Sequence, residues 1–132
     1  MQSTTWPAFI TLLTIVLLSW TSVLVARARA RYGVKAPATS GNPDFERVFR
    51  VQMNTIEASV IFLPALWLAA LYGTPIVVAV AGLIWIGGRV LYALGYIKEA
   101  AKRSAGFGIA ALGFGALLLD ATIGLLRSLL AH

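Results

Sequence analysis

The chain has 132 residues, of which 59% are hydrophobic and only 12% charged, and its formal net charge is +6. So much apolar surface, with a mean hydropathy of +0.83, cannot be hidden in the core of one small soluble domain. The absence of cysteine excludes disulfides, thiolate metal ligands and a cysteine nucleophile. We therefore predict an integral membrane protein, and we expect no metal cofactor.

Four apolar stretches are long enough to cross a bilayer, which takes about 20 helical residues. They predict helices over residues 6–26, 45–72, 75–96 and 104–131, with Asp44 and Ser104 as N-caps of the second and fourth. The expected fold class is all-α, an integral membrane four-helix bundle in a single domain, residues 1–132. No basic region precedes the first stretch, so we expect an anchor and not a cleaved signal peptide.

Basic side chains gather in two of the predicted loops, and the turn between the second and third helices has none. They are Arg27, Arg29, Arg31, Lys35 and Arg47 after the first helix, and Lys98, Lys102 and Arg103 after the third. The positive-inside rule then places both basic loops in the cytoplasm and both termini on the opposite side. The charge suits anionic lipid and anionic solutes, and no nucleic-acid partner is expected because no nucleic-acid-binding motif is present.

The second predicted helix carries polar residues at positions where a membrane helix usually has apolar side chains. Arg50, Asn54 and Glu57 lie within an arc of about 60°, and Arg47 extends this stripe toward the cytoplasmic end. Ionisable groups near the bilayer centre cost about 2.5 to 3.5 kcal/mol each, so by default they mark a functional site. Gln52 points almost oppositely, toward lipid in a monomer or toward a neighbour in an oligomer.

The third predicted helix carries a second stripe, Arg89, Tyr92 and Tyr96, and Lys102 and Arg103 follow it. Together the two stripes predict a pocket with several cations, one carboxylate, an amide and phenols. Its complement is a small zwitterion with excess negative charge, because guanidinium groups bind carboxylates in bidentate fashion. The alternative is structural: Arg50 and Glu57 neutralise one another, and the tyrosines are interfacial anchors.

The same residues form two long motifs. F-E-R-x-x-R-x-Q-x-N-x-x-E runs from Phe45 to Glu57, and R-x-x-Y-x-x-x-Y runs from Arg89 to Tyr96. With the following Lys102-Arg103, they resemble the membrane-associated proteins in eicosanoid and glutathione metabolism, the MAPEG family. The resemblance implies a homotrimer with glutathione at each subunit interface near the cytoplasmic face. The short chain resembles bacterial members, which implies the bacterial inner membrane.

Roles for individual residues follow from this resemblance. It implies that one subunit binds glutathione through Arg50, Asn54, Glu57, Tyr92 and Tyr96, and that the neighbour contributes Arg29 and Gln52. Beside these, we expect supporting roles for Arg47, Arg89 and Lys102. Arg103 matches the catalytic arginine that holds the glutathione sulfur as a thiolate. This role is chemically reasonable, because the thiolate is the nucleophile and an adjacent guanidinium lowers the pKa of a free thiol from about 8.5.

The implied function is that of a glutathione transferase or peroxidase. Its second substrate is a lipophilic electrophile or lipid hydroperoxide, which arrives from membrane lipid between helices one and four of adjoining subunits. The chain departs from some relatives at two positions. Ala58 follows Glu57 where those relatives have a tyrosine, and Ala30 follows Arg29 where they have a second basic residue. Two alternatives stay open: a non-catalytic scaffold that binds lipid or glutathione, and a small exporter whose Glu57 alternates between protons and lipophilic cations.

Overall fold

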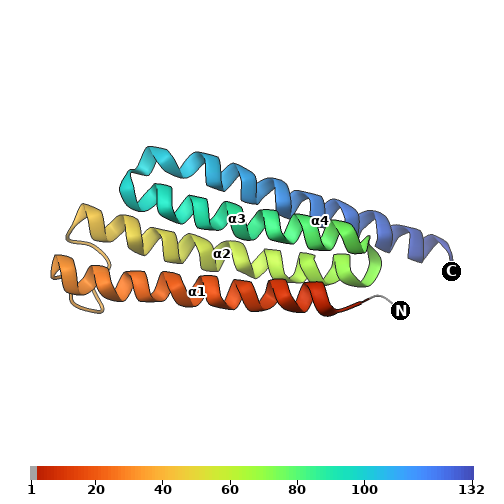
Figure 1. Cartoon of the computed structure of the whole chain (residues 1–132), viewed down its shortest axis with the longest axis horizontal. Helices are drawn as coiled ribbons and strands as arrows, with labels where there is room; N and C mark the ends of the chain where they lie inside the picture. The colour runs from red at the N-terminus through yellow and green to blue at the C-terminus, as the bar shows by residue number, and fades with distance from the viewer. Residues whose placement is uncertain (1–2) are drawn as a thin grey trace.

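The computed structural model describes residues 3–132 as four antiparallel helices (Figure 1). These are α1 (Thr5–Tyr32), α2 (Pro43–Tyr72), α3 (Pro75–Lys98) and α4 (Ser104–Leu130), with a short 3-10 turn, η1 (Ala100–Arg103), before α4. All four are long and apolar enough to cross a membrane. Residues 3–132 contain no strand. The predicted all-α, four-helix membrane fold is therefore confirmed.

Helix α1 is longer than predicted. It ends at Tyr32 and not at Ala26, so Arg27, Arg29 and Arg31 lie on its last turns and not in a loop. The helix stops at Gly33, which has φ 67° and whose N–H donates to the carbonyl oxygen of Arg29. Glycine adopts this left-handed conformation without the penalty that a Cβ brings. The apolar pattern marks where hydrocarbon ends, whereas the glycine marks where the helix ends.

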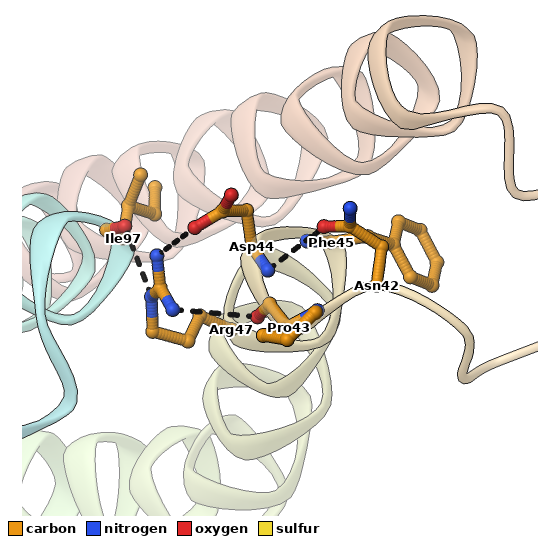
Figure 2. A network of polar contacts seen from close by, with 6 residues as sticks. All are labelled: Asn42, Pro43, Asp44, Phe45, Arg47 and Ile97. Atoms are coloured by element: carbon orange, nitrogen blue, oxygen red, sulfur yellow. Dashed lines mark hydrogen bonds and ion pairs between the residues drawn. The ribbon is translucent and has the colours of Figure 1, made fainter.

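The N-cap of α2 is Asn42, and the prediction of Asp44 was wrong. The Asn42 Oδ1 accepts hydrogen bonds from the backbone N–H of Asp44 (2.9 Å) and of Phe45 (3.0 Å), as Figure 2 shows. Pro43 then fills the first helical position, where its missing N–H costs nothing. The prediction of Ser104 as a cap was also wrong, because η1 runs directly into α4 and no side chain caps that helix.

Arg47 joins the beginning of α2 to the end of α3. Its guanidinium forms an ion pair with Asp44 on its own helix, and its Nε donates to the carbonyl oxygen of Ile97 at 3.3 Å (Figure 2). The last carbonyls of a helix lack partners within the helix, so a cation there is favourable. The contact fixes the spacing of α2 and α3 at the end of the bundle that holds the basic loops.

In the bundle, α2 and α3 lie between α1 and α4 (Figure 1). The centre of the core is a stacked pair, Phe62 of α2 and Trp85 of α3, with ring centroids 3.7 Å apart. Helices α3 and α4 approach closely through glycines: a Cβ at Gly106 would lie 2.1 Å from the backbone nitrogen of Tyr92. Small residues allow such contact between membrane helices.

Asp120, whose role the sequence leaves open, holds the other end of the bundle. Its Oδ2 accepts from the backbone N–H of Thr74 at 2.7 Å, and its Oδ1 accepts from the Thr74 hydroxyl at 3.0 Å. The carboxylate therefore ties α4 to the turn between α2 and α3. This is the end at which the described N-terminal residues and the C-terminus lie, opposite the basic loops (Figure 1).

Candidate functional site

Arg89 links the two predicted polar stripes. Its side chain is buried, and its Nη2 donates to Asn54 Oδ1 and to Thr55 Oγ1, both at 2.9 Å. The guanidinium carbon also lies 4.1 Å from the ring centroid of Tyr92. Arg89 thus contacts one member of each stripe and holds α2 and α3 in register at this depth.

The hydrogen bond from Arg89 determines which group of the Asn54 side chain can bind a ligand. Its carbonyl oxygen is occupied, while its amide nitrogen has no hydrogen-bond partner among residues 3–132 and can donate to a ligand. Thr55 was not among the predicted site residues. Its hydroxyl accepts from Arg89 and donates to the carbonyl of Val51 at 2.7 Å. The one available signal was the presence of an arginine on the neighbouring helix, which needs acceptors when it is buried.

A row of ring contacts continues from Arg89 to the basic end. Tyr92 and Tyr96 meet edge to face with centroids 5.6 Å apart, and the Arg103 guanidinium carbon lies 5.4 Å from the Tyr96 centroid. Tyr92 is buried, Tyr96 is half-buried, and Arg103 is exposed with a single hydrogen bond at 3.4 Å to the carbonyl of Ala100. We call these four residues, Arg89, Tyr92, Tyr96 and Arg103, the cation–aromatic row.

Two charged residues of the polar stripe on α2, Arg50 and Glu57, have no ion-pair partner within residues 3–132. Arg50 and Glu57 are exposed, and the ion pairs within residues 3–132 join Arg47 to Asp44 and Lys102 to Glu99. Arg50 and Glu57 therefore do not neutralise one another within a subunit, which contradicts that part of the structural alternative. Lys102, at 3.7 Å from Glu99, and Arg47 are both engaged in local ion pairs.

A small apolar cavity of about 120 Å³ opens beside Arg89, between α2, α3 and α4. Apart from Arg89, its lining is apolar and includes Ala58, where the chain departs from some members of the family that it resembles, together with Trp85, Phe107 and Phe114. Ligand pockets usually measure about 300–1,000 Å³. One subunit therefore does not enclose a tripeptide here.

Arg29 and Gln52 lie apart from the cation–aromatic row. The Nη1 of Arg29 donates to the carbonyls of Ala38 (2.7 Å) and Val34 (3.3 Å), and its guanidinium carbon lies 5.0 Å from the Phe45 ring centroid. Arg29 thus orders the loop between α1 and α2. Gln52 is half-buried. No hydrogen bond, ion pair or ring contact joins either residue to the row within residues 3–132.

The fold and the two polar stripes define a four-helix membrane protein with a cationic, partly aromatic site toward one end of the bundle. The chain belongs to the MAPEG family, whose model matches residues 7–123. The protein is accordingly an integral, multi-pass membrane protein.

Three relatives illustrate the range of the family. The chain is 48% identical over 124 residues to an uncharacterised protein of Synechocystis sp., covering 94% of this chain and 90% of the relative. It is 42% identical over 113 residues to human microsomal glutathione S-transferase 2, covering 85% and 76%. It is 39% identical over 123 residues to leukotriene C4 synthase of Cavia porcellus, covering 93% and 82%.

Proposed function

We propose that this protein is a membrane glutathione transferase or glutathione peroxidase that activates glutathione as a thiolate. The thiolate attacks a lipophilic electrophile or a lipid hydroperoxide. Two observations support the proposal together: relatives 42% and 39% identical bear the names of a microsomal glutathione S-transferase and a leukotriene synthase, and the cation–aromatic row leads from the bundle interior to Arg103. Of the two, the cation–aromatic row supports the proposed thiolate chemistry more directly.

Glutathione is a tripeptide with two carboxylates, one ammonium and a thiol, and the α2 stripe complements it. Arg50 offers an unpaired guanidinium for a carboxylate, and Glu57 offers an unpaired carboxylate for the ammonium. Asn54 supplies a directional amide donor, because Arg89 occupies its carbonyl oxygen. Tyr92 and Tyr96 add phenol groups on the facing helix.

Arg103 acts on the sulfur. A cation beside the thiol favours the thiolate and lowers the pKa of the glutathione thiol from about 8.5. The thiolate then attacks an electrophilic carbon, forming a thioether as the leaving group departs with the bonding electrons. With a hydroperoxide, it attacks the terminal peroxide oxygen and releases an alcohol. The resulting glutathione sulfenic acid is reduced by a second glutathione to the disulfide and water.

The proposed assembly is a homotrimer in which each glutathione lies between two subunits. Arg29 and Gln52 of one subunit complete the site of the next. The exposure of Arg50, Glu57 and Arg103 on a single subunit supports this arrangement, as does the separation of Arg29 and Gln52 from the cation–aromatic row. The lipophilic substrate enters from the bilayer between α1 and α4 of adjoining subunits.

We further propose that the protein lies in a bacterial inner membrane with its basic loops in the cytoplasm. The chain has no cysteine, so single cysteines at Thr39→Cys and His132→Cys can be labelled selectively. In intact cells, a membrane-impermeant thiol reagent should label His132→Cys and spare Thr39→Cys until the cells are opened. The reverse pattern would overturn the orientation.

The function is tested with the purified protein, glutathione, and either a chromogenic aryl halide or a lipid hydroperoxide. We expect conjugate formation or hydroperoxide reduction well above the rate without protein. If both reactions stay at background while glutathione still binds, the enzyme proposal fails and the non-catalytic scaffold takes its place.

A further inference from the structure

A groove runs between α1 and α3, away from the proposed glutathione site. Its part farther from the basic end is a hollow of about 280 Å³ lined by apolar side chains: Leu13, Val16, Leu17, Trp20, Ile86 and Val90. A second hollow of about 210 Å³ follows toward the basic end, and Leu24, Arg27, Arg31 and Ile97 are among its lining residues. Neither hollow shares a lining residue with the cavity beside Arg89.

The two hollows follow one another along α1, and we call them together the α1–α3 groove. On α1 the lining residues recur every three or four positions, from Leu13 and Leu17 through Trp20 and Leu24 to Arg27 and Arg31, so they share one face of the helix. From Trp20 to Arg27 the axial rise is about 10 Å, at about 1.5 Å per residue. The groove is therefore apolar at membrane depth and cationic where the bundle leaves the hydrocarbon.

The two arginines of the groove lie one helical turn apart and are exposed. Neither makes a hydrogen bond or an ion pair within residues 3–132, although the Arg31 guanidinium carbon lies 5.4 Å from the ring centroid of Tyr32. Of the acidic residues at this end, Asp44 pairs with Arg47, Glu99 pairs with Lys102, and Glu46 in the first turn of α2 forms no ion pair within residues 3–132. Arg27 and Arg31 thus present uncompensated charge.

The whole net charge of +6 lies at this end of the molecule. The cations elsewhere are Arg89 and Arg127, and they are matched in number by Glu57 and Asp120. An anion near the groove therefore meets a strongly positive surface as well as two forked guanidinium donors, which suit phosphate geometry.

We propose that the α1–α3 groove binds one anionic phospholipid from the leaflet that the basic end faces. The phosphate lies between Arg27 and Arg31, and an acyl chain lies along the hollow that contains Val16 and Val90. An amphiphile fills both parts of the groove, whereas free phosphate fills only the cationic part. The site needs neither glutathione nor catalysis, so it stands independently of the proposed function.

The test uses the full chain, stripped of lipid in a neutral detergent. Phosphatidylglycerol and phosphatidylcholine with identical acyl chains are titrated separately, and bound lipid is counted by native mass spectrometry. We expect phosphatidylglycerol to bind at least about ten-fold more tightly. The double variant Arg27→Gln/Arg31→Gln should lose this preference while binding phosphatidylcholine as the wild type does, which also shows that it is folded.

A matched control removes the same charge beside the groove. Lys35 and Lys98 are exposed at the same end and line neither hollow. Lys35→Gln/Lys98→Gln should keep the preference for phosphatidylglycerol, and Val16→Trp, which fills the apolar hollow, should weaken both lipids. Equal loss of preference in the lysine and arginine variants would overturn the site, since it would reduce the effect to net charge.

Two other occupants of the groove, inorganic phosphate and a second copy of the chain, are tested separately. If inorganic phosphate displaces phosphatidylglycerol at equal concentration, the apolar hollow contributes nothing and the lipid site is rejected. If Val16→Cys subunits form disulfide-linked pairs in the membrane, a second copy of the chain covers the groove and the lipid proposal is likewise rejected. We expect no displacement by phosphate and no cross-link.

Discussion

Arg89 places a guanidinium inside a membrane bundle with no acidic partner among residues 3–132. Its Nε is buried without a hydrogen-bond partner in the same part of the chain. Burying a cation without an ionic partner costs free energy, so we expect an apolar side chain of similar size to be tolerated at this position. The hydrogen bonds to Asn54 and Thr55 and the contact with the Tyr92 ring offset part of this cost, and the bond to Asn54 also gives the arginine a role in the proposed site.

Arg89→Met tests that role. We expect the melting temperature in detergent to stay unchanged or rise, because the bundle no longer buries an unpaired charge. Glutathione should bind about ten-fold more weakly, because a hydrogen bond from a charged donor, worth about 1.5–3 kcal/mol, no longer holds Asn54. Thermal unfolding and calorimetric titration measure the two quantities.

Arg127→Met is the control for Arg89→Met, because Arg127 is exposed near the far end of the bundle. It should leave glutathione affinity as it is. If Arg89→Met binds glutathione as tightly as the wild type, Arg89 does not organise the site.

Sequence patterns could predict which side chains form the stripes, but not their partners. Helical periodicity places Arg50, Asn54 and Glu57 on one face whatever surrounds the helix. That Arg89 bonds to Asn54 and Thr55 depends on the axial shift between α2 and α3, which the sequence does not encode locally. The bonds from Arg29 to the loop carbonyls depend likewise on how that loop folds back.

The contact between α3 and α4 depends on glycine. A Cβ at Gly106 would lie 2.1 Å from the backbone nitrogen of Tyr92 and 2.7 Å from the carbonyl oxygen of Gly88. Both are backbone atoms, so the helices themselves must separate to admit a methyl group. Gly108, on the same helix, has no atom within 4 Å of its Cβ position.

Gly106→Ala should therefore destabilise the protein by about 1–3 kcal/mol, as overpacking usually does, and weaken glutathione binding by displacing Tyr92. Gly108→Ala should be neutral or stabilising, because alanine is favoured over glycine in a helix by about 1 kcal/mol. Denaturant or thermal unfolding compares the two variants. Equal stability of both would show that α3 and α4 are not in close contact at Gly106.

The helices themselves were largely predictable, since each needs a long apolar stretch, whereas their ends were predicted less well. The apolar pattern predicts a loop at Arg27, Arg29 and Arg31 because they lie beyond the hydrocarbon, yet Gly33 sets the end of α1. At α2, the Asn42-Pro43 pair was the better start signal, since asparagine caps and proline suits the first turn. Asp120 needed the fold, because its partner Thr74 is far away in the sequence.

The whole molecule, as proposed, is a ring of three subunits in which each site takes Arg50 from one subunit and Gln52 from the next. Homo-oligomers of Arg50→Ala or of Gln52→Ala should each lose at least about ten-fold in kcat/KM for glutathione. Every mixed ring contains one site with both residues intact. Mixed rings purified away from the homo-oligomers should therefore recover about one third of the wild-type sites.

Subunit mixing is measured by co-expressing the two variants with different tags and purifying rings that carry both. Recovery of activity above that of either homo-oligomer supports a site shared between subunits. Mixed rings that form but stay as inactive as the parents would show that one subunit supplies both residues.

The state of the glutathione sulfur tests the proposed mechanism most directly. We would follow the far-ultraviolet absorbance of the thiolate while pH is raised over the protein saturated with glutathione, with S-methylglutathione as the blank. The wild type should show a thiol pKa about one to three units below 8.5, because the Arg103 cation favours the anion. Lys102→Ala should keep this low pKa, and Arg103→Ala should return it toward 8.5 while glutathione still binds. A bound thiol that stays protonated at neutral pH in the wild type, or an unchanged pKa in Arg103→Ala, would contradict the proposed role of Arg103.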